Sequence, residues 1–483
     1  MRDLDEFTAH YGSGSNVAGQ YSGSLNNAGE KLLVQLPDPL PLGISRFAYE
    51  SFWYPTTDGG GYSLVIRDPA APLFTWNQAA GWQVGSELGG SPGRADGQTL
   101  DPDLRINEAL THTDLPQTDT IELHNPTAGE ITVGTTPGYE QVWLSDSRSD
   151  YCKFEVPAGT VIPAGGFVTF DESNFNPGGG TLPGDFALDG AHGESLYLTT
   201  GDGTGRIRRF LDDVSFPAAA NTESFARFAN AAGRSYFYPS EDLTLGQDNT
   251  TGGNGPRVGP LVVSELNYSP LDTNLADTVD AGDLEYVEIH NPTDSPVELA
   301  RWFDANGNSQ RDQDLVNHEV EPWHLSVGQN DFVFPLDGQH QGVILPAHGT
   351  LLVLAFNPQT NNQASGGKLK DFCDAYGIGY TVNGDVIVPD VPMVGGYSGN
   401  LSNEGELVTL WRPDEPPTGE PQFFPLIVED QADYDEQTPW PEGAAGTGDS
   451  LHRAGPSLWG NQPTSFTAAA PSPDTVAFSP VIG

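Results

Sequence analysis

The chain matches itself at several places, and this internal repetition constrains its fold more than any other feature. Residues 21–30 read YSGSLNNAGE and residues 397–406 read YSGNLSNEGE, so Tyr, Ser, Gly, Leu, Asn, Gly and Glu recur at one constant offset. A second pair, DTIELHNPT at 119–127 and EYVEIHNPT at 285–293, shares a Glu-apolar-His-Asn-Pro-Thr core. These matches indicate small structural units that are used more than once.

Two further matches complete the order of elements within one unit. VIPAGGFVTF at 161–170 parallels VILPAHGTLLVLAF at 343–356, and GESLYL at 193–198 parallels GELVTL at 405–410. One unit therefore has an opening strand, the His-Asn-Pro-Thr strand and turn, a Pro-Ala-Gly turn into a strand, and a Gly-Glu strand. A tail that contains aromatic residues and Ser closes the unit.

The matches divide the chain into three units. Residues 1–100 (the first unit) correspond to the back half of a unit, 101–250 (the middle unit) to a complete shorter one, and 257–474 (the third unit) to a complete longer one. Residues 475–483 have the pattern of the first strand of a further unit. The joins are rich in Gly, Pro, Asp and Asn, which is typical of linkers.

Composition agrees with a β fold. Gly 58 and Pro 40 make up about a fifth of the chain, which suits many short strands joined by turns and excludes a helical bundle. Short apolar runs such as 261–266, 350–356 and 406–411 predict antiparallel strands of all-β sandwiches. Apolar residues spaced three and four apart and followed by Gly predict short helices near 2–11 and 368–376, with very little helix elsewhere.

The repeated residues resemble the lamin tail domain found in bacterial surface and secreted proteins. The resemblance rests on V-x-S-E-L at 262–266, E-x-H-N-P-T at 288–293 and L-x-N-x-G-E at 401–406. The middle unit departs from the last motif, because Leu188 precedes Gly193 by one extra residue and the Asn is lost. The long tandem form is similar to large repeat proteins of planctomycete-type bacteria. The resemblance implies tandem immunoglobulin-like β-sandwiches with a binding or architectural role.

The repeated polar residues also have a physical interpretation that does not depend on the family. Glu288 and His290 alternate with apolar neighbours, which predicts a strand with one face exposed to water. The Asn-Pro-Thr that follows predicts a turn, because Asn caps turns and Pro fixes φ. The recurring Glu is expected to accept backbone N–H bonds at a strand edge; the alternative is contact with a ligand.

Catalytic motifs are weak in this sequence. Gly448–Leu451 spells the Gly-Asp-Ser-Leu motif of an esterase family, but it lies near the C-terminus of a β-rich unit, and its counterpart Gly61–Leu64 lacks the Asp. No nucleophile elbow, H-E-x-x-H or P-loop is present. Four histidines lie near one another at spacings that fit no standard zinc pattern and are expected to face solvent: His318, His324, His340 and His348. The sequence therefore predicts a protein that is not an enzyme.

One metal site is a candidate. Oxygen-bearing side chains occupy the first three ligand positions and the ninth position of a calcium loop: Asp304, Asn306, Asn308 and Asp312. The loop is degenerate, since Gly307 falls one position early for the usual turn and Leu315 stands where a Glu is expected. The alternative is a polar surface loop that binds no metal. No other cofactor is predicted.

The net charge of the chain excludes further classes of protein. The chain has 66 Asp plus Glu against 20 Lys plus Arg, and a net charge of −46, which excludes general nucleic-acid binding. No apolar run is long enough to predict a transmembrane segment. The Lys-poor acidic composition suits a saline medium, although a GC-rich genome would also favour Arg. The two cysteines, Cys152 and Cys373, are far apart in the sequence and are predicted to be buried free thiols.

The leading hypothesis is a non-enzymatic structural, adhesion or assembly module of a large cell-surface or secreted repeat protein. The alternative is an accessory carbohydrate- or protein-binding region of a longer secreted enzyme. The partner, protein or glycan, is not identified by the sequence. The first unit lacks its opening strands, so the chain is expected to be a fragment whose signal peptide was lost with the missing part.

Without those strands, the first unit is expected to expose an apolar sheet edge. Two coverings of that edge are predicted. One is packing by the second unit. The other is addition of the C-terminal strand of this chain or of a neighbouring one, which would give self-association.

Overall fold

The structure is a computed structural model, and part of the chain is described in it. The described residues are 3–27, 29–35, 43–50, 54, 57, 59, 61–66, 69, 76, 81–87, 89–94, 96, 104–113, 117–147, 149–201, 203–205, 207–271, 280–304, 319–397, 399–417, 419–476 and 478. Two compact bodies divide the chain: Met1–Phe216 with Asn221–Phe228 and Gly233–Asn254, and Gly255–Gly483 with Pro217–Ala220 and Ala229–Ala232. The predicted strand at 475–483 lies mostly outside the described residues.

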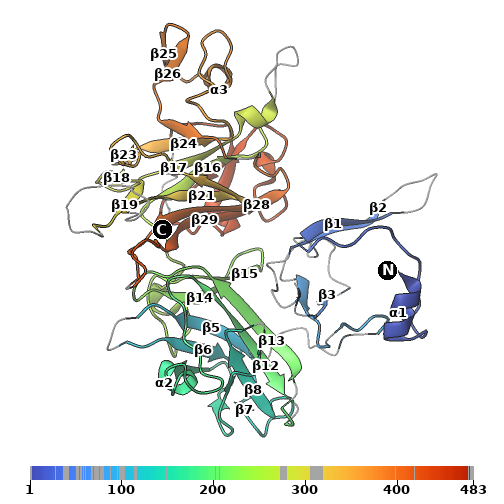
Figure 1. The fold of residues 1–483 in the computed structure, drawn as a ribbon. Helices are drawn as coiled ribbons and strands as arrows, with labels where there is room; N and C mark the ends of the chain where they lie inside the picture. The colour runs from blue at the N-terminus through green and yellow to red at the C-terminus, as the bar shows by residue number, and fades with distance from the viewer. Residues whose placement is uncertain are drawn as a thin grey trace. The chain divides into compact units, whose positions relative to one another are not determined.

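The middle unit consists of two antiparallel sheets, drawn in blue-green and green in Figure 1. One sheet has the strand order β11-β6-β5-β14-β15, the other has β13-β12-β8-β9, and β10 and β7 form a small ribbon. The strands are β5 (Arg105–Leu110), β6 (Thr120–His124), β7 (Ile131–Thr132), β8 (Gln141–Ser145), β9 (Phe154–Glu155), β10 (Val161–Ile162), β11 (Phe167–Asp171), β12 (Glu194–Gly201), β13 (Ile207–Phe216), β14 (Ser224–Ala229) and β15 (Ser235–Pro239). One helical turn, α2 (Glu172–Phe175), follows β11, and a 3-10 turn, η4 (Thr251–Gly253), closes the unit.

The third unit has the same plan with additions. Its larger sheet has the order β27-β24-β17-β16-β30-β31 and its smaller sheet β22-β21-β28-β29. The strands are β16 (Val262–Asn267), β17 (Tyr286–His290), β18 (Val297–Glu298), β19 (Ala300–Trp302), β20 (Val320–Pro322), β21 (His324–Val327), β22 (Asn330–Val333), β23 (Ile344–Leu345), β24 (Thr350–Leu354), β25 (Tyr380–Asn383), β26 (Val386–Pro389), β27 (Met393–Gly395), β28 (Gly405–Pro413), β29 (Leu426–Asp435), β30 (Ser450–Arg453) and β31 (Phe466–Ala469). The helices are α3 (Lys368–Tyr376) and the 3-10 turns η5 (Ala281–Leu284), η6 (Glu442–Ala444) and η7 (Pro463–Ser465).

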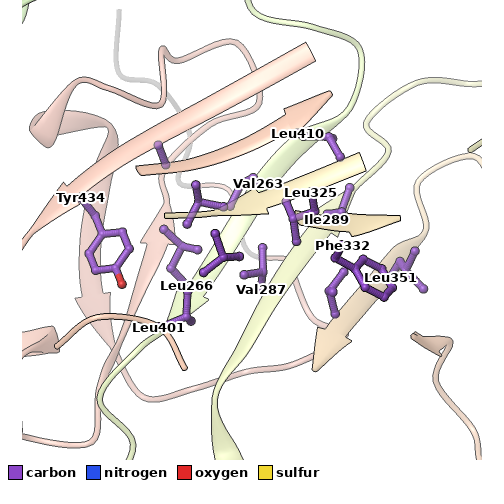
Figure 2. Close-up of a cluster of buried hydrophobic side chains, with 14 of the residues drawn as sticks. Val263, Leu266, Val287, Ile289, Leu325, Phe332, Leu351, Leu401, Leu410 and Tyr434 are labelled. Atoms are coloured by element: carbon purple, nitrogen blue, oxygen red, sulfur yellow. The ribbon is translucent and has the colours of Figure 1, made fainter. Parts of the chain in front are cut away.

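The core of the third unit lies between its two sheets. Figure 2 shows Val263 and Val287 from the larger sheet among Leu325 and Leu410 from the smaller one, and all four are buried. A second apolar cluster around Phe372 packs α3 against the larger sheet. Two facing sheets with an apolar core between them make this an all-β, sandwich-like fold, as predicted from the sequence.

The first unit contains one helix and two ribbons in its described part. These elements are α1 (Leu4–Tyr11), β1 (Gly29–Gln35) paired with β2 (Gly43–Glu50), and β3 (Leu64–Ile66) paired with β4 (Trp82–Val84). The side chain of Asp3 caps α1 by accepting hydrogen bonds from the N–H groups of Asp5 (2.9 Å) and Glu6 (3.0 Å).

Both helices predicted from apolar spacing are confirmed by α1 and α3. Each ends at a glycine with positive φ, Gly12 at 80° and Gly377 at 67°. The short α2 was not predicted, because one helical turn is too short to show a periodic pattern. None of the described helices is long and apolar enough to cross a membrane.

The hairpin β1–β2 has the register of the hairpin β28–β29. Glu30 lies opposite Tyr49, and Glu406 lies opposite Tyr434. In both hairpins the tyrosine hydroxyl lies 3.2 Å from the glutamate and donates to the carbonyl at the start of the turn. The L-x-N-x-G-E motif therefore corresponds to the same local structure in the first and third units.

Candidate functional site

Two glutamates from neighbouring strands lie opposite each other in each complete unit, and one of them belongs to the repeated His-Asn-Pro-Thr strand. On the two neighbouring strands that open the larger sheet, Glu108 lies opposite Glu122, and Glu265 lies opposite Glu288. All four side chains are buried. A β-bulge just before the first glutamate of each pair shifts the register and brings the two carboxylates to opposing positions. We call each arrangement a carboxylate pair.

In the middle unit, Glu108 is held by groups from two later segments. Ser224 at the start of β14 donates its hydroxyl to Glu108 Oε1 at 2.6 Å. Thr244, in the segment that returns after β15, donates its backbone N–H to Oε1 at 3.1 Å and its hydroxyl to Oε2 at 2.8 Å. The carboxylate therefore joins the first strand of the unit to its last segment.

The partner carboxylate, Glu122, is satisfied in the same way. Asn107 at the bulge donates its side-chain N–H to Glu122 Oε1 at 2.8 Å. The backbone N–H of Gly246, two residues after Thr244, donates to Oε2. Every oxygen of this carboxylate pair thus accepts a hydrogen bond from inside the unit.

The third unit repeats these contacts with different residues. The hydroxyls of Ser450 and Tyr286 donate to Glu265 Oε1. The backbone N–H of Ser472, in the returning tail, donates to the same oxygen at 3.1 Å. Ser450 and Ser472 thus occupy the places that Ser224 and Thr244 hold in the middle unit.

Glu288 completes the second carboxylate pair. Ser264 at the bulge donates its hydroxyl to Oε1 at 2.7 Å, and the backbone N–H of Asp474 donates to Oε2 at 2.7 Å. The prediction that the Glu288 and His290 face of this strand is wet is therefore wrong. The returning tail covers that face, and the ring of Phe478 lies against the ring of His290, with 5.3 Å between centroids.

Burial changes the acidity of the second glutamate in each pair. Loss of water around the carboxylates raises the pKa of Glu122 and that of Glu288 to about 7, although hydrogen bonds to both side chains oppose the shift. Both groups therefore take up protons near neutral pH.

An ion pair, fully buried in the third unit and partly exposed in the middle unit, supports each bulge from the smaller sheet. Asp430 of β29 accepts the N–H of Val263 at 2.8 Å and pairs with Arg453 of β30. Asp212 of β13 likewise pairs with Arg227 of β14 at 2.6 Å. Each pair ties the bulged strand of one sheet to a strand of the other.

The asparagine of the His-Asn-Pro-Thr motif forms the centre of a turn. The side chain of Asn291 donates to the carbonyls of Ser295 (2.8 Å), Leu345 (3.2 Å) and Pro346 (2.9 Å), and its Oδ1 accepts from the N–H of Thr293 at 3.0 Å. Asn125 makes the corresponding four contacts in the middle unit. The predicted turn is confirmed, and it is joined to the Pro-Ala-Gly turn by one side chain.

Comparison of the chain with protein-family models, curated proteins and solved structures found no match. The contacts within the chain are thus the basis on which its function can be argued.

The serine of the Gly-Asp-Ser-Leu motif lies beside a histidine and a glutamate, which are the residue types of a catalytic triad. Ser450 Oγ lies 2.9 Å from His452 Nε2, and the same nitrogen lies 3.5 Å from Glu265 Oε1. In a triad, the histidine meets the serine with one ring nitrogen and the acid with the other. Here one nitrogen faces both groups, and the buried hydroxyl donates to the carboxylate. The arrangement is that of a structural hydrogen-bond network.

The predicted calcium ligands are mostly outside the described residues. Asp304 is half-buried beyond the end of β19, whereas Asn306, Asn308 and Asp312 are not among the described residues. Within the described part of the chain, no three His, Cys, Asp or Glu side chains lie close enough to hold a metal ion. The calcium site remains a prediction.

The histidines and cysteines differ in part from expectation. His348 is exposed as predicted, but His324 is largely buried between Glu321 (3.2 Å) and Asp331 (2.8 Å). Burial alone would lower the pKa of His324, but the hydrogen bonds to these two carboxylates outweigh it and raise the pKa. His318 lies outside the described residues.

Both cysteines are free. Cys373 is buried as predicted, whereas Cys152 is only half-buried.

Sequence reasoning missed the partners of the two carboxylate pairs. Asn107 belongs to no motif, and Ser264, although it is part of the V-x-S-E-L motif, carries no sign of a bulge. The ion pair of Asp430 and Arg453 joins residues with no recognisable spacing. One signal was present in the sequence. Ser450 of the Gly-Asp-Ser-Leu motif has a counterpart in Ser63, whereas Asp449 has none. Recurrence without the Asp indicates a structural serine.

Proposed function

We propose that this chain is a non-catalytic array of β-sandwich units that serves as a spacer, adhesion or assembly module. Tandem units with the same internal bonding suit such a role, because each unit adds length and surface without needing a separate site. The resemblance to the lamin tail domain supports the same proposal. It also supports an immunoglobulin-like classification of the sandwiches.

One observation carries the proposal: each carboxylate pair is fully used in holding its own unit together. Glu108 and Glu265 both accept a serine hydroxyl and the backbone N–H of the returning segment. Glu122 and Glu288 both accept a second backbone N–H from that segment. A catalytic pair would need one carboxylate free to meet a substrate.

The surface chemistry supports a location outside the cell. A net charge of −46 on 483 residues keeps such a chain soluble and repels other acidic surfaces, and salt screens this repulsion. We place the protein at the cell surface or in the secreted fraction on this basis and on the family resemblance.

A second candidate function is an accessory binding region, and one feature of the third unit favours it. The insertion between β24 and β28 forms a small cleft of about 240 Å³, lined by apolar residues such as Leu369, Val388 and Met393 and by the polar residues Gln359 and Asn362. The middle unit has no such insertion in its described part. A cleft of this kind could take a short peptide or the apolar face of a sugar ring.

Replacement of Glu265 by Gln tests the structural role. The neutral amide oxygen of Gln accepts the hydrogen bonds from Tyr286, Ser450 and Ser472 more weakly than a carboxylate does, so the free energy of unfolding of the third unit should fall by about 1–3 kcal/mol. Glu404→Gln, at an exposed position of the same unit, is the control. Catalytic groups usually cost stability, so a more stable Glu265→Gln protein would overturn the proposal.

A further inference from the structure

The least exposed lysine of the chain lies against a carboxylate in the middle unit. Lys153, at the bend before β9, has 23% of its side chain exposed, less than any of the other three lysines. Its Nζ lies 2.5 Å from Oδ1 of Asp146, the residue that follows β8. The amine and the carboxyl group therefore meet across the turn that joins β8 to β9.

The contact between Lys153 and Asp146 is close without being an ordinary hydrogen bond. Asp146 Oδ1 is buried and accepts no hydrogen bond from any residue that the structure describes. The ammonium nitrogen thus touches the carboxyl group outside the alignment of a charge-assisted hydrogen bond. The carboxyl carbon is one covalent bond from Oδ1, so the nitrogen stands close to the distance of about 3–3.5 Å at which reacting atoms meet.

Glu194 supplies a third group that can move a proton. In the ladder of β8 and β12, Ser145 lies opposite Tyr197, and continuing this register puts Asp146 and Glu194 on one face as diagonal neighbours. Burial raises the pKa of Glu194 to about 7, the charge of Asp146 adds to the rise, and Lys153 opposes it. Glu194 therefore exchanges a proton near neutral pH beside both groups.

The surroundings of these groups are apolar. Leu144 and Leu196, on the same face of β8 and β12, are fully buried. The ring of Phe186, which is 4% exposed, lies 5.8 Å from Lys153 Nζ. Apolar surroundings disfavour the charged forms of an amine and a carboxyl group, and they limit the access of water to the carboxyl carbon.

The residue type at position 153 agrees with a role for the amine itself. The chain has four Lys against 16 Arg, so arginine is its usual cation. An ion pair with aspartate needs only a cation, and arginine forms such pairs with better geometry than lysine does. A primary amine is required where nitrogen acts as a nucleophile.

We propose that Lys153 and Asp146 condense to an amide bond that closes the turn between β8 and β9. One proton passes from the ammonium group, by way of Glu194, to the Asp146 carboxylate, which leaves a neutral amine and a carboxylic acid. The nitrogen bonds to Cγ of Asp146, and the bond from Cγ to the hydroxyl group breaks. Glu194 carries a second proton from the nitrogen to that hydroxyl, and one water leaves. The charge of the pair is zero before and after, and no oxidant is needed.

The fold supplies what this reaction lacks in water. Well-oriented groups in one molecule react as if one of them were present at about 10⁵ M or more, which favours condensation of groups already in contact. The product fastens β9, a two-residue strand at the edge of its sheet, to β8. Both cysteines of the chain are free, so the tie does not duplicate a disulfide. The inference does not depend on the proposed function.

Mass spectrometry of the purified full chain tests the inference. The intact mass should be lower than that of the sequence by one water. Trypsin cleaves after Arg148, which lies between the two residues in the sequence, and it does not cleave after an acylated lysine. Peptides 106–148 and 149–206 should therefore stay joined. Lys370, whose ion pair with Asp374 lies on α3, is the internal control, and cleavage after it should be complete.

Two variants assign the chemistry. Lys153→Arg keeps the positive charge but not the amine, so it should have the full sequence mass and separate peptides. Glu194→Gln should form the joined peptides about a hundredfold more slowly, because the proton carrier is lost.

Three results would overturn the inference. The first is a parent chain with the full sequence mass and separate peptides. The second is loss of water that persists in Lys153→Arg, which would identify cyclisation of an aspartate instead. The third is joining at the parent's rate in Glu194→Gln.

Discussion

Replacement of Arg453 by Met should be the most damaging single change in the third unit. The Arg453 and Asp430 side chains have no exposed surface. Arg453 donates to Asp430 Oδ1 at 3.0 Å, to the Leu458 carbonyl at 3.0 Å and to the Val263 carbonyl at 3.2 Å. Methionine fills a similar volume but leaves all of these acceptors without their donor.

The expected loss follows from the state of Asp430 in this variant. The N–H of Val263 would still donate to Asp430, but the buried carboxylate would stand without a counter-ion. Breaking one side of a fully buried ion pair costs about 3–5 kcal/mol. At a urea slope of about 2 kcal/mol per molar, the unfolding midpoint of the third unit should fall by about 1.5–2.5 M. Arg227→Met should cost about 1–2 kcal/mol, because that pair is partly exposed to solvent.

The assay is urea unfolding followed by hydrogen exchange with peptide resolution, which assigns each transition to one unit. The first unit shows which residues can take the two positions of this ion pair, and it therefore supplies the substitutions for a control. In the first unit, Ser45 lies opposite Val34 as Asp430 lies opposite Leu410, and Ile66 lies opposite Trp82 as Arg453 lies opposite Phe466.

The first unit thus has neither charge of the pair. The double variant Arg453→Ile with Asp430→Ser should recover at least half of the loss, because no unpaired charge stays buried. A single variant within 1 kcal/mol of the parent chain would refute the reasoning. So would a double variant less stable than Arg453→Met.

Three further predictions concern pH, the repeated asparagine and calcium. Burial raises the pKa of Glu122 and Glu288 to about 7. Their contribution to the free energy of unfolding is therefore full below about pH 4.5 and is lost as the pH rises through 7. The melting temperature should accordingly rise when the pH is lowered from 8 to 6, and Glu288→Gln should flatten that rise. Asn291→Ala should cost about 1–3 kcal/mol in urea unfolding, and Asn291→Asp should recover only part of it, since Asp keeps the acceptor but not the donors. Millimolar calcium should raise the melting temperature of the third unit, and Asp304→Ala should abolish the shift; no shift with the parent chain would remove the calcium site.

Local features of the fold could be predicted from the sequence because local residues determine them. Helix α3 ends at Gly377, as its spacing indicated, and Asn291 forms the turn that Asn-Pro-Thr predicts. Gly405, with φ of 104°, begins the strand of the Gly-Glu motif, a backbone conformation that glycine adopts without strain. These features depend on neighbours within a few residues along the chain.

The carboxylate pairs could not be predicted, because they depend on contacts distant in sequence. The bulge at Ser264 decides that Glu265 and Glu288 face each other, and no residue type marks a bulge of this kind. The tail at Ser472 returns to the pair from about 200 positions away. Alternation along the strand showed that Glu288 and His290 share a face, but it could not show that this face is covered.

In each complete unit, the buried glutamates fasten the returning segment to the opening strands. Hydrogen exchange at the backbone amide of Asp474 in a Glu288→Gln chain measures this fastening directly. We expect exchange at Asp474 to accelerate about tenfold or more, with Leu352 in the neighbouring strand β24 unchanged. Unchanged protection of Asp474, together with an unchanged melting temperature, would contradict the claim.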